Sequence, residues 1–336
     1  MVLDAVNSSM ARILEPYKKW VTANPQLLAD IESTVKCLSY FTAGRFNNST
    51  LASELIYSVP NLIVLFNDLI MYSNKCIDLK LPQFESKIKI WLTVIEYTET
   101  LFEISAKKVW GQNGKWFIIT VIQLFKAVLR LSLVYKYKEQ VTRSPPIQPL
   151  NREQLNKSAD EKLKEGFKLK RSGTVVRSIK ATSSIDARMW EPLSMDVNDN
   201  HSSSRIPASG KNMALAETLY ITKPLLHLGC ISFTGENQWP PWLLSLIVDL
   251  ISLKIFQEEA KAVPFNKEDQ KELYRRKLSL LLYILRSPFY DKYSRVRIYA
   301  LLTVLAAKVP LARFVANPVK KYLPHWQSIY FYMWSC

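Results

Sequence analysis

The sequence predicts an all-α fold, a multi-helix bundle with two marginal membrane-associated or membrane-spanning helices and a disordered central linker. Apolar residues recur at helical spacing along most of the 336 residues, and no stretch shows sustained alternation with a period of two. The chain has only 8 glycines but 17 prolines. Few glycines argue against a glycine-rich nucleotide-binding fold, and many prolines favour several helices with sharp ends.

Four helices are expected in the N-terminal half, at residues 24–44, 51–72, 83–110 and 115–137. Each has apolar side chains three and four positions apart, the spacing that puts them on one face of a helix. Pro60 removes a backbone donor from the second of these helices, so a kink or break is predicted there.

The C-terminal half predicts four more helical segments. Two of them cover residues 213–230 and 239–256. A third begins with charged residues near position 266, becomes apolar and ends at Pro288, because proline cannot continue a helix. A fourth covers about 294–308, and a strongly aromatic tail follows it.

Composition divides the chain into three parts: a helical half at 1–143, a linker at 144–212 and a second helical half at 213–336. The linker contains prolines, is basic, and is dominated by serine, lysine and aspartate. Such a segment cannot bury enough apolar surface to fold, so it is expected to be largely disordered. The membrane candidates are residues 110–137 and 239–256, one in each helical half.

Charged residues interrupt both membrane candidates. Residues 116–125 are mostly apolar, but Lys126 and Arg130 follow on one helical face, and the second candidate contains Asp249. A charge at the centre of a bilayer costs on the order of 2.5–3.5 kcal/mol. Trp and Tyr residues at the ends of the candidates suit the two membrane interfaces. The alternative is that both segments are buried core helices of a large soluble bundle.

No catalytic, cofactor or metal site is predicted. The three histidines lie in separate regions, the four cysteines form no CxxC pair, and no known catalytic or nucleotide-binding string occurs. The protein is therefore expected not to be an enzyme. His227, in an apolar helix, is expected to be a hydrogen-bonded core residue. Asp249, a candidate intramembrane acid, is by default a functional-site hypothesis; the alternative is that it pairs with a basic side chain inside the bundle.

An unusual break follows the apolar run that ends at Leu285. Pro288 stops the helix, and three aromatic rings and several charges surround it. Such a mixture suits a membrane interface or a docking surface. Arg286, Tyr290 and Arg295 are therefore candidate partner or interface contacts. The alternative is a plain helix–helix corner whose rings fill the core.

The formal net charge of +16 points to nucleic acid, an anionic membrane surface or acidic proteins as partners. The basic linker lacks interleaved aromatic residues, and no nucleic-acid-binding signature occurs, so nucleic acid is not the expected partner. A soluble basic helical scaffold that binds nucleic acid or anionic partners remains the alternative. A membrane enzyme of lipid metabolism ranks last, because it would need a His/Asp constellation.

Several strings, in order and with matching spacing, resemble the family of the peroxisomal biogenesis protein peroxin sixteen. They span both helical halves and leave out mainly the linker: FTAGRFNNSTLASELIYSVPNLIVLFND, AKKVWGQNGKW, SPPIQPLNRE, LLLYILRSPFYDKYSR and YLPHWQSIYFYMW. None of them is a catalytic motif, and it is the ordered set that makes the resemblance specific.

The resemblance implies an integral membrane protein of the peroxisome that reaches it partly through the endoplasmic reticulum. It implies a role in assembling the peroxisomal membrane by recruiting or docking the machinery that inserts other membrane proteins. The implied partners are the cytosolic import receptor peroxin nineteen and its membrane anchor peroxin three, together with membrane lipids. Family members have two spans and cytosolic termini, which would make residues 110–135 and 239–256 the spans.

The family associates targeting with a dense basic stretch ahead of the first span. The corresponding region has four lysines, diluted by Asp78 and Glu85, and these are the doubtful targeting lysines: Lys75, Lys80, Lys87 and Lys89. Two spans with cytosolic termini would also place the basic linker in the lumen, against the positive-inside tendency. A monotopic bundle with re-entrant helices would remove that conflict.

Overall fold

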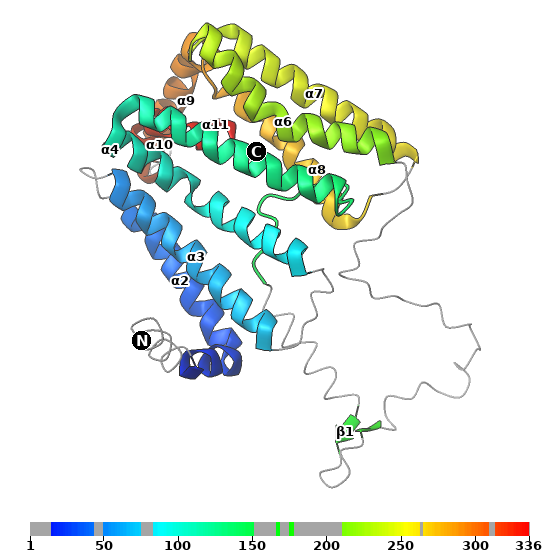
Figure 1. Ribbon diagram of the computed structural model, residues 1–336. Helices are drawn as coiled ribbons and strands as arrows, with labels where there is room; N and C mark the ends of the chain where they lie inside the picture. Colours follow the sequence, from blue (N-terminus) through cyan, green and yellow to red (C-terminus); the bar gives the residue numbers. More distant parts are fainter. Residues whose placement is uncertain are drawn as a thin grey trace, which may run out of the picture. The chain divides into compact units, whose positions relative to one another are not determined.

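Most of the residues that the structure describes are helical. A computed structural model (Figure 1) describes residues 15–43, 50–74, 83–150, 166–168, 175–177, 210–262, 265–308 and 313–335. Two compact units interleave along the sequence. The first consists of residues 1–37, 63–80 and 149–202, and the second of residues 38–62, 81–148 and 203–336.

The first two predicted helices are confirmed as α2 (Pro25–Ala43) and α3 (Thr50–Asn74). Helix α3 continues through Pro60, so the predicted break does not occur there. Within the first unit, the amide of Asn67 donates to Glu32 (2.7 Å) and accepts from the hydroxyl of Tyr17 (2.7 Å). These bonds flank a small apolar core made of Val21, Leu28, Ile70 and Met71.

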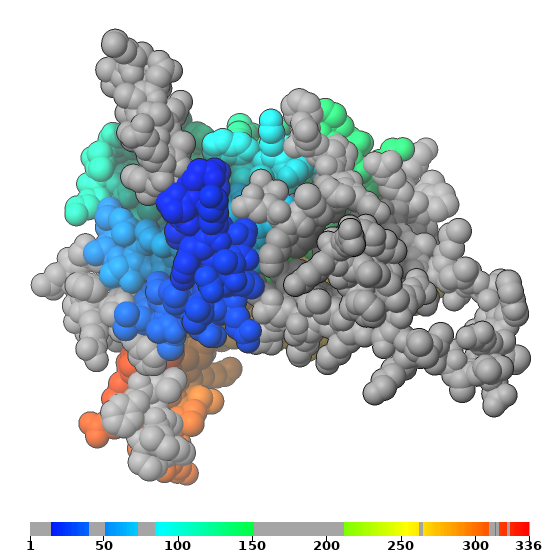
Figure 2. All heavy atoms as spheres, turned by 90° about the horizontal axis from the view of Figure 1, so that it is seen from below, coloured from blue at the N-terminus to red at the C-terminus, as the bar shows by residue number. Residues whose placement is uncertain are grey.

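One side of α2 is apolar and exposed. Leu27, Ile31, Val35 and Leu38 lie three or four positions apart and are between 42% and 60% exposed. Figure 2, which shows the molecule from below, has α2 in dark blue at the surface of that face. A contiguous apolar stripe of this kind is typical of a surface that contacts a partner or a lipid.

The next two predicted helices form one hairpin. Helix α4 (Gln83–Tyr135) is interrupted at Gly111, which has φ 73° and ψ −159°. This left-handed conformation favours glycine. A Cβ atom on Gly114 would lie 2.2 Å from Cβ of Trp110, so the turn also needs glycine there. The sequence therefore builds a turn between the predicted helices at 83–110 and 115–137, and brings their polar faces together.

Helices α6 (Gly210–Thr234) and α7 (Trp239–Ala262) lie side by side as a second hairpin (Figure 1). The second half of α4 packs against α6 through Ala127, Val134 and Ile221. Helix α8 (Lys267–Ser279) packs against this second hairpin. Its Leu273 lies in an apolar cluster with Met213 of α6 and Phe256 of α7. The membrane candidates therefore lie within one helical unit.

The predicted break near Pro288 is confirmed as an irregular corner. Helix α8 passes into a 3-10 turn, η3 (Leu280–Ile284), and a π-helical turn, η4 (Tyr290–Ser294), follows the proline. The chain then continues in three further helices: α9 (Arg295–Lys308), α10 (Arg313–Ser328) and α11 (Tyr330–Trp334). The short α11 carries the aromatic ending of the chain.

Most of the predicted linker lies outside the described residues. Within it, two three-residue strands, β1 (Gly166–Lys168) and β2 (Val175–Arg177), pair antiparallel. No strands were predicted from the sequence, so this pair differs from the prediction in the part of the chain that the structure describes. Residues 144–150 run back along the helices in extended and turn conformations. The three-part division at 144 and 212 stays a prediction.

Candidate functional site

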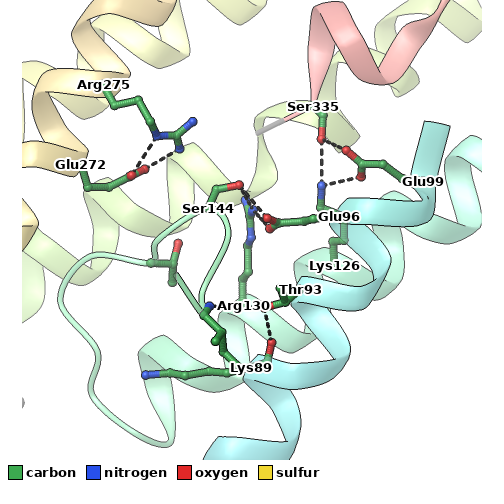
Figure 3. A network of polar contacts seen from close by, with 12 residues as sticks. Lys89, Thr93, Glu96, Glu99, Lys126, Arg130, Ser144, Glu272, Arg275 and Ser335 are labelled. Atoms are coloured by element: carbon green, nitrogen blue, oxygen red, sulfur yellow. Dashed lines mark hydrogen bonds and ion pairs between the residues drawn. The ribbon is translucent and has the colours of Figure 1, made fainter. Parts of the chain in front are cut away.

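Three ion pairs join the two halves of α4. Arg130 Nη2 lies 2.7 Å from Glu96, and Lys126 Nζ lies 2.7 Å from Glu99 (Figure 3). In the third pair, Lys115 Nζ lies 3.1 Å from Glu103. All six side chains are less than 10% exposed. We call these six residues the buried charged seam. A buried charge must be paired and hydrogen-bonded, and the antiparallel hairpin supplies each cation with a carboxylate.

The spacing along α4 explains why the seam is continuous. Glu96, Glu99 and Glu103 follow one another at three and four positions, so they share one face of the first half. Lys126 and Arg130 are four positions apart on the second half and meet that face. The sequence analysis identified the two cations as interruptions of a span, but it did not predict their partners.

The opposite face of the second half of α4 is apolar. Phe117, Leu124 and Val128 are 65%, 55% and 58% exposed. The charges that made this segment a marginal span therefore face the protein, and large apolar side chains face outward. This arrangement lowers the cost of placing Lys126 and Arg130 at membrane depth, because intramembrane charges are tolerated when they pair inside a bundle.

The C-terminal helix α11 docks onto the seam. The backbone N–H groups of Tyr330 and Phe331 donate to the two oxygens of Glu103, at 2.8 and 3.1 Å. Lys115 donates to the carbonyl of Ser328 (2.9 Å), and the hydroxyl of Ser335 bonds Glu99 and Lys126, both at 2.8 Å.

Helix α3 also holds this end of the chain. The hydroxyl of Tyr332 donates to both oxygens of Glu54, at 2.8 Å each. Burial raises the pKa of Tyr332, and so does the Glu54 carboxylate. The residue therefore stays a neutral donor.

The segment after α4 closes the other end of the seam. Ser144 donates to Glu96 (2.9 Å), and the backbone N–H of Ile147 donates to Thr93 (3.3 Å). Lys89 lies 3.1 Å from Glu139. Burial raises the pKa of Glu139, and the Lys89 ammonium opposes this shift. These contacts hold the segment against the first half of α4 (Figure 3).

Asp249, the predicted intramembrane acid, lies in a second buried cluster. Its carboxylate is 3.0 Å from Lys223 Nζ on α6 and accepts a hydrogen bond of 2.6 Å from the hydroxyl of Tyr283. All three residues are buried. Of the two alternatives for Asp249, pairing inside the bundle is the arrangement that the structure contains.

Another buried pair ties α6 to α8. Both terminal nitrogens of Arg276 bond Glu217, at 2.7 and 3.0 Å, and one of them also donates to the carbonyl of Thr142 (2.7 Å). Burial works against the charge on Arg276, but Glu217, Tyr220 and Glu272 together outweigh it and raise the pKa of the guanidinium. Neither residue attracted notice in the sequence, because a pairing 59 positions apart depends on the tertiary fold.

The predicted contact residues of the corner are placed differently from one another. Arg286 and Tyr290 are 3% and 2% exposed, so both lie inside the protein, whereas Arg295 is exposed. Ser287 donates to Asp291 across the break. The corner thus buries the ring of Tyr290, leaves the ring of Tyr293 43% exposed, and leaves Arg295 outside. Contact of any of the three with a partner stays a prediction.

His227 is buried and hydrogen-bonded, as expected. Its Nδ1 lies 3.2 Å from the hydroxyl of Tyr330, and its ring stacks on Trp334 at 3.7 Å. Burial lowers the pKa of His227 to about 3, and the cations Arg286 and Lys223 add to this effect. His201 lies outside the described residues. Among the described residues, no cluster of three or more His, Cys, Asp or Glu side chains could hold a metal ion.

Two of the four candidate targeting lysines, Lys75 and Lys80, lie outside the described residues. Lys87 is exposed near the start of α4. Lys89 is half-buried and pairs with Glu85 (3.2 Å) as well as with Glu139. A targeting role for these lysines stays a prediction.

Three helices of the described chain are long and apolar enough to cross a membrane. They cover Leu51–Tyr72, Glu85–Tyr135 and Trp239–Lys261. The second and third contain the two predicted candidates, but the first was predicted only as an apolar helix. Its signal was the length of apolar sequence between Glu54 and Asp68, both of which are buried. Since Gly111 interrupts α4, the part after it has about 24 residues, enough for a span of about 30 Å.

Comparison with known proteins agrees with this membrane architecture. A family model described as peroxisomal membrane protein (Pex16) matches residues 15–328. Peroxisome biogenesis protein 16 of Arabidopsis thaliana is 25% identical over 378 aligned positions, which cover 95% of this chain and 99% of that protein. Peroxisome biogenesis factor 16 of Dictyostelium discoideum is 30% identical over 121 positions, which cover 35% of this chain and 30% of that protein.

No solved structure matches the chain. The family match covers nearly all of the sequence, including the α4 hairpin, both clusters around α6 and most of the C-terminal helices. The chain therefore belongs to the Pex16 family of peroxisomal membrane proteins and has a role in the biogenesis of the peroxisomal membrane.

Proposed function

We propose that the protein acts in the peroxisomal membrane by docking and recruiting the machinery that inserts other membrane proteins. The proposed partners are the cytosolic import receptor peroxin nineteen and its membrane anchor peroxin three. The protein would work through protein–protein contacts rather than by catalysis, and would reach the peroxisome partly through the endoplasmic reticulum. Membership of the Pex16 family is the single observation that carries this proposal.

The distribution of polar groups supports a contact function. The buried charged seam forms hydrogen bonds to α11 on one side and to Ser144 on the other. The surface instead offers apolar side chains on α2 and on the outer face of α4. Exposed apolar surface of this extent is typical of binding to protein or lipid, whereas catalysis needs accessible polar groups.

The corner after η4 is the proposed contact surface for a soluble partner. Arg295 is exposed, and its neighbour Val296 is 78% exposed at the start of α9. An exposed arginine beside an apolar side chain is typical of residues that dominate protein interfaces. Arg286 and Tyr290 would support this surface from inside, because both are buried beneath it.

Capture of the two partners on the full chain in lipid nanodiscs tests the proposal. Wild-type protein should retain purified peroxin nineteen or peroxin three above the level of empty nanodiscs. Arg295→Glu should weaken that capture about tenfold or more, the size of effect expected for losing a hot-spot contact. Lys277→Glu, an equal charge reversal at an exposed position on α8, is the matched control and should leave capture unchanged. Failure of the wild-type chain to capture either partner would contradict the docking function.

A further inference from the structure

Arg286 differs from the other buried cations of the described chain. Lys115, Lys126, Lys223 and Arg276 each lie within about 3 Å of a carboxylate. Arg286 is only 3% exposed, yet its Nε and Nη1 atoms have no hydrogen-bond partner among the described residues. A buried charge without a partner is strongly unfavourable. Its retention therefore points to a ligand that supplies the missing negative charge.

Two aromatic rings hold the guanidinium in place without satisfying its N–H groups. The guanidinium carbon lies 4.2 Å from the ring centre of Tyr283 and 4.4 Å from that of Trp334. The two rings are 6.0 Å apart and nearly perpendicular, at 86°, so they form two walls of a corner. Cation–π contact stabilises the charge, but the N–H groups at the edge of the guanidinium remain available as donors.

The described groups around Arg286 leave its positive charge without a carboxylate of its own. The cations Arg286 and Lys223 both act on His227, whose ring stacks on Trp334. The nearby carboxylate of Asp249 is already bonded to Lys223 and to the hydroxyl of Tyr283. The local field therefore favours an anion that comes from outside this cluster.

Aromatic residues place Arg286 near the end of a membrane candidate. Helix α7 begins at Trp239, and the indole N–H of Trp242 donates to the carbonyl of Tyr283 (3.2 Å). The Trp242 ring stacks on Phe289 at 5.7 Å, and Trp239 lies 6.4 Å from Tyr293. Clusters of Trp and Tyr at the end of a span mark the level of the lipid headgroups.

A second candidate span begins at the same end of the bundle. Trp116, just after the turn of α4, donates its indole N–H to Glu236 (3.0 Å), three residues before α7 begins. Tryptophans from both spans therefore lie at one level of the bundle. Arg286 is connected to that level through Tyr283 and Trp242, which are 5.7 Å apart.

We propose that Arg286 binds the phosphate group of a membrane phospholipid. A guanidinium matches phosphate oxygens with two parallel N–H donors, which lysine cannot do. At headgroup level, the phosphate of a phospholipid is the anion present at highest concentration. Trp334, one of the two aromatic walls, is partly exposed, so the phosphate would reach the guanidinium past the edge of that ring.

Thermal unfolding of the full chain in a neutral detergent tests this site. The probe is short-chain dioctanoyl phosphatidylinositol, with dioctanoylglycerol as the lipid that lacks phosphate and sodium phosphate as the anion that lacks a lipid. The dioctanoyl phosphatidylinositol should raise the unfolding temperature by several degrees, because a ligand that binds only the folded state stabilises it. The other two compounds should raise it by much less at the same concentration.

The variants separate a ligand site from a structural role. Arg286→Met should bind the dioctanoyl phosphatidylinositol about tenfold more weakly, the factor expected for losing a charge-assisted contact. Without lipid, its unfolding temperature should equal or exceed that of the wild type, since an unpaired buried charge has been removed. Arg297→Gln, at an exposed position on α9, is the matched control and should keep the full lipid response.

Three results would overturn the proposal. The first is an equal response to dioctanoylglycerol, which would assign the effect to the acyl chains. The second is an equal response to sodium phosphate, which would remove the lipid from the assignment. The third is loss of folding by Arg286→Met in lipid-free detergent, which would show that Arg286 is a structural residue. Lipid binding does not depend on the import receptor, so this outcome and the outcome of the partner-capture experiment are independent.

Discussion

The pair formed by Arg276 and Glu217 predicts how much folding free energy depends on a single buried contact. Arg276→Ala would leave the Glu217 carboxylate buried without its cation, which typically costs about 3–5 kcal/mol of folding free energy. Arg275→Ala is the control, since Arg275 pairs with Glu272 at a half-exposed position, where a pair contributes about 0–1 kcal/mol. Denaturant unfolding in detergent measures both losses. Equal losses in the two variants would contradict the burial argument.

His227 predicts a dependence of stability on pH. Its pKa is about 3 in the folded protein and about 6.5 in the unfolded chain. Below pH 6.5 the unfolded chain therefore binds a proton that the folded protein does not, and stability falls as the pH is lowered. The loss should reach about 2 kcal/mol at pH 5.

The variant His227→Phe isolates this effect. Phenylalanine keeps a flat ring against Trp334 but has no titrating group. Unfolding measured at pH 7.5 and pH 5 should show a smaller loss in this variant than in the wild type. The same loss in both proteins would mean that other groups cause the pH dependence.

At the scale of elements, the turn of α4 depends on two glycines for different reasons. Gly114→Ala would place a Cβ atom 2.2 Å from Cβ of Trp110, so the hairpin must open and the buried charged seam with it. Gly111→Ala has free space but a φ of 73° with a ψ of −159°, a conformation that is essentially restricted to glycine, and it should cost about 1–3 kcal/mol.

Gly229→Ala on α6 is the matched control for both glycine variants. Nothing lies within 4 Å of its Cβ position, and alanine favours a helix by about 1 kcal/mol over glycine. Unfolding temperatures should therefore fall in the order Gly229→Ala, Gly111→Ala, Gly114→Ala. A stable Gly114→Ala protein would contradict the close approach of position 114 to Trp110.

The outward face of α4 can be tested by adding a charge to it. Leu124 is 55% exposed near the middle of the segment after Gly111, so Leu124→Lys would place a cation toward lipid at a cost of about 2.5–3.5 kcal/mol. The variant should be extracted by alkaline carbonate more readily than the wild type. Val109→Lys, at an exposed position next to the turn, should resist extraction as the wild type does. Equal resistance in both variants would indicate that Leu124 does not face lipid.

Periodicity predicted the helices well, because the apolar positions that define a helix lie close together in the sequence. The helices at 24–44, 51–72 and 239–256 were found within a few residues of their ends. Pro60 was predicted to kink or break α3, and the helix is not broken there, since it continues on both sides of the proline. The break in α4 occurs instead at Gly111, where only glycine is suited to the backbone conformation.

The partners of the buried charges could not be predicted. Lys126 and Asp249 each stood out as a charge in an apolar helix, but Glu99 and Lys223 were not linked to them. Such pairings depend on which helices pack together and in which register, and periodicity carries no information on either. The docking of α11 onto Glu103 was missed for the same reason, because it joins residues 227 positions apart.

At the scale of the whole molecule, the seam and the clusters around α6 explain how a basic chain can be a membrane protein. Among its 45 lysines and arginines, Lys115, Lys126 and Arg130 are buried and are each paired with a glutamate. Pairing lets them lie at membrane depth while the outer face of α4 remains apolar. This Pex16-family chain is therefore expected to be inserted in the peroxisomal membrane, in whose biogenesis it has a role.

Rescue of cells that lack the native protein tests this claim most directly. A fluorescent fusion of the full chain is expressed in such cells, imaged beside a peroxisomal membrane marker, and extracted with alkaline carbonate. We expect restored peroxisomes, punctate overlap with the marker and resistance to extraction. A diffuse or nuclear signal with complete extraction would contradict it.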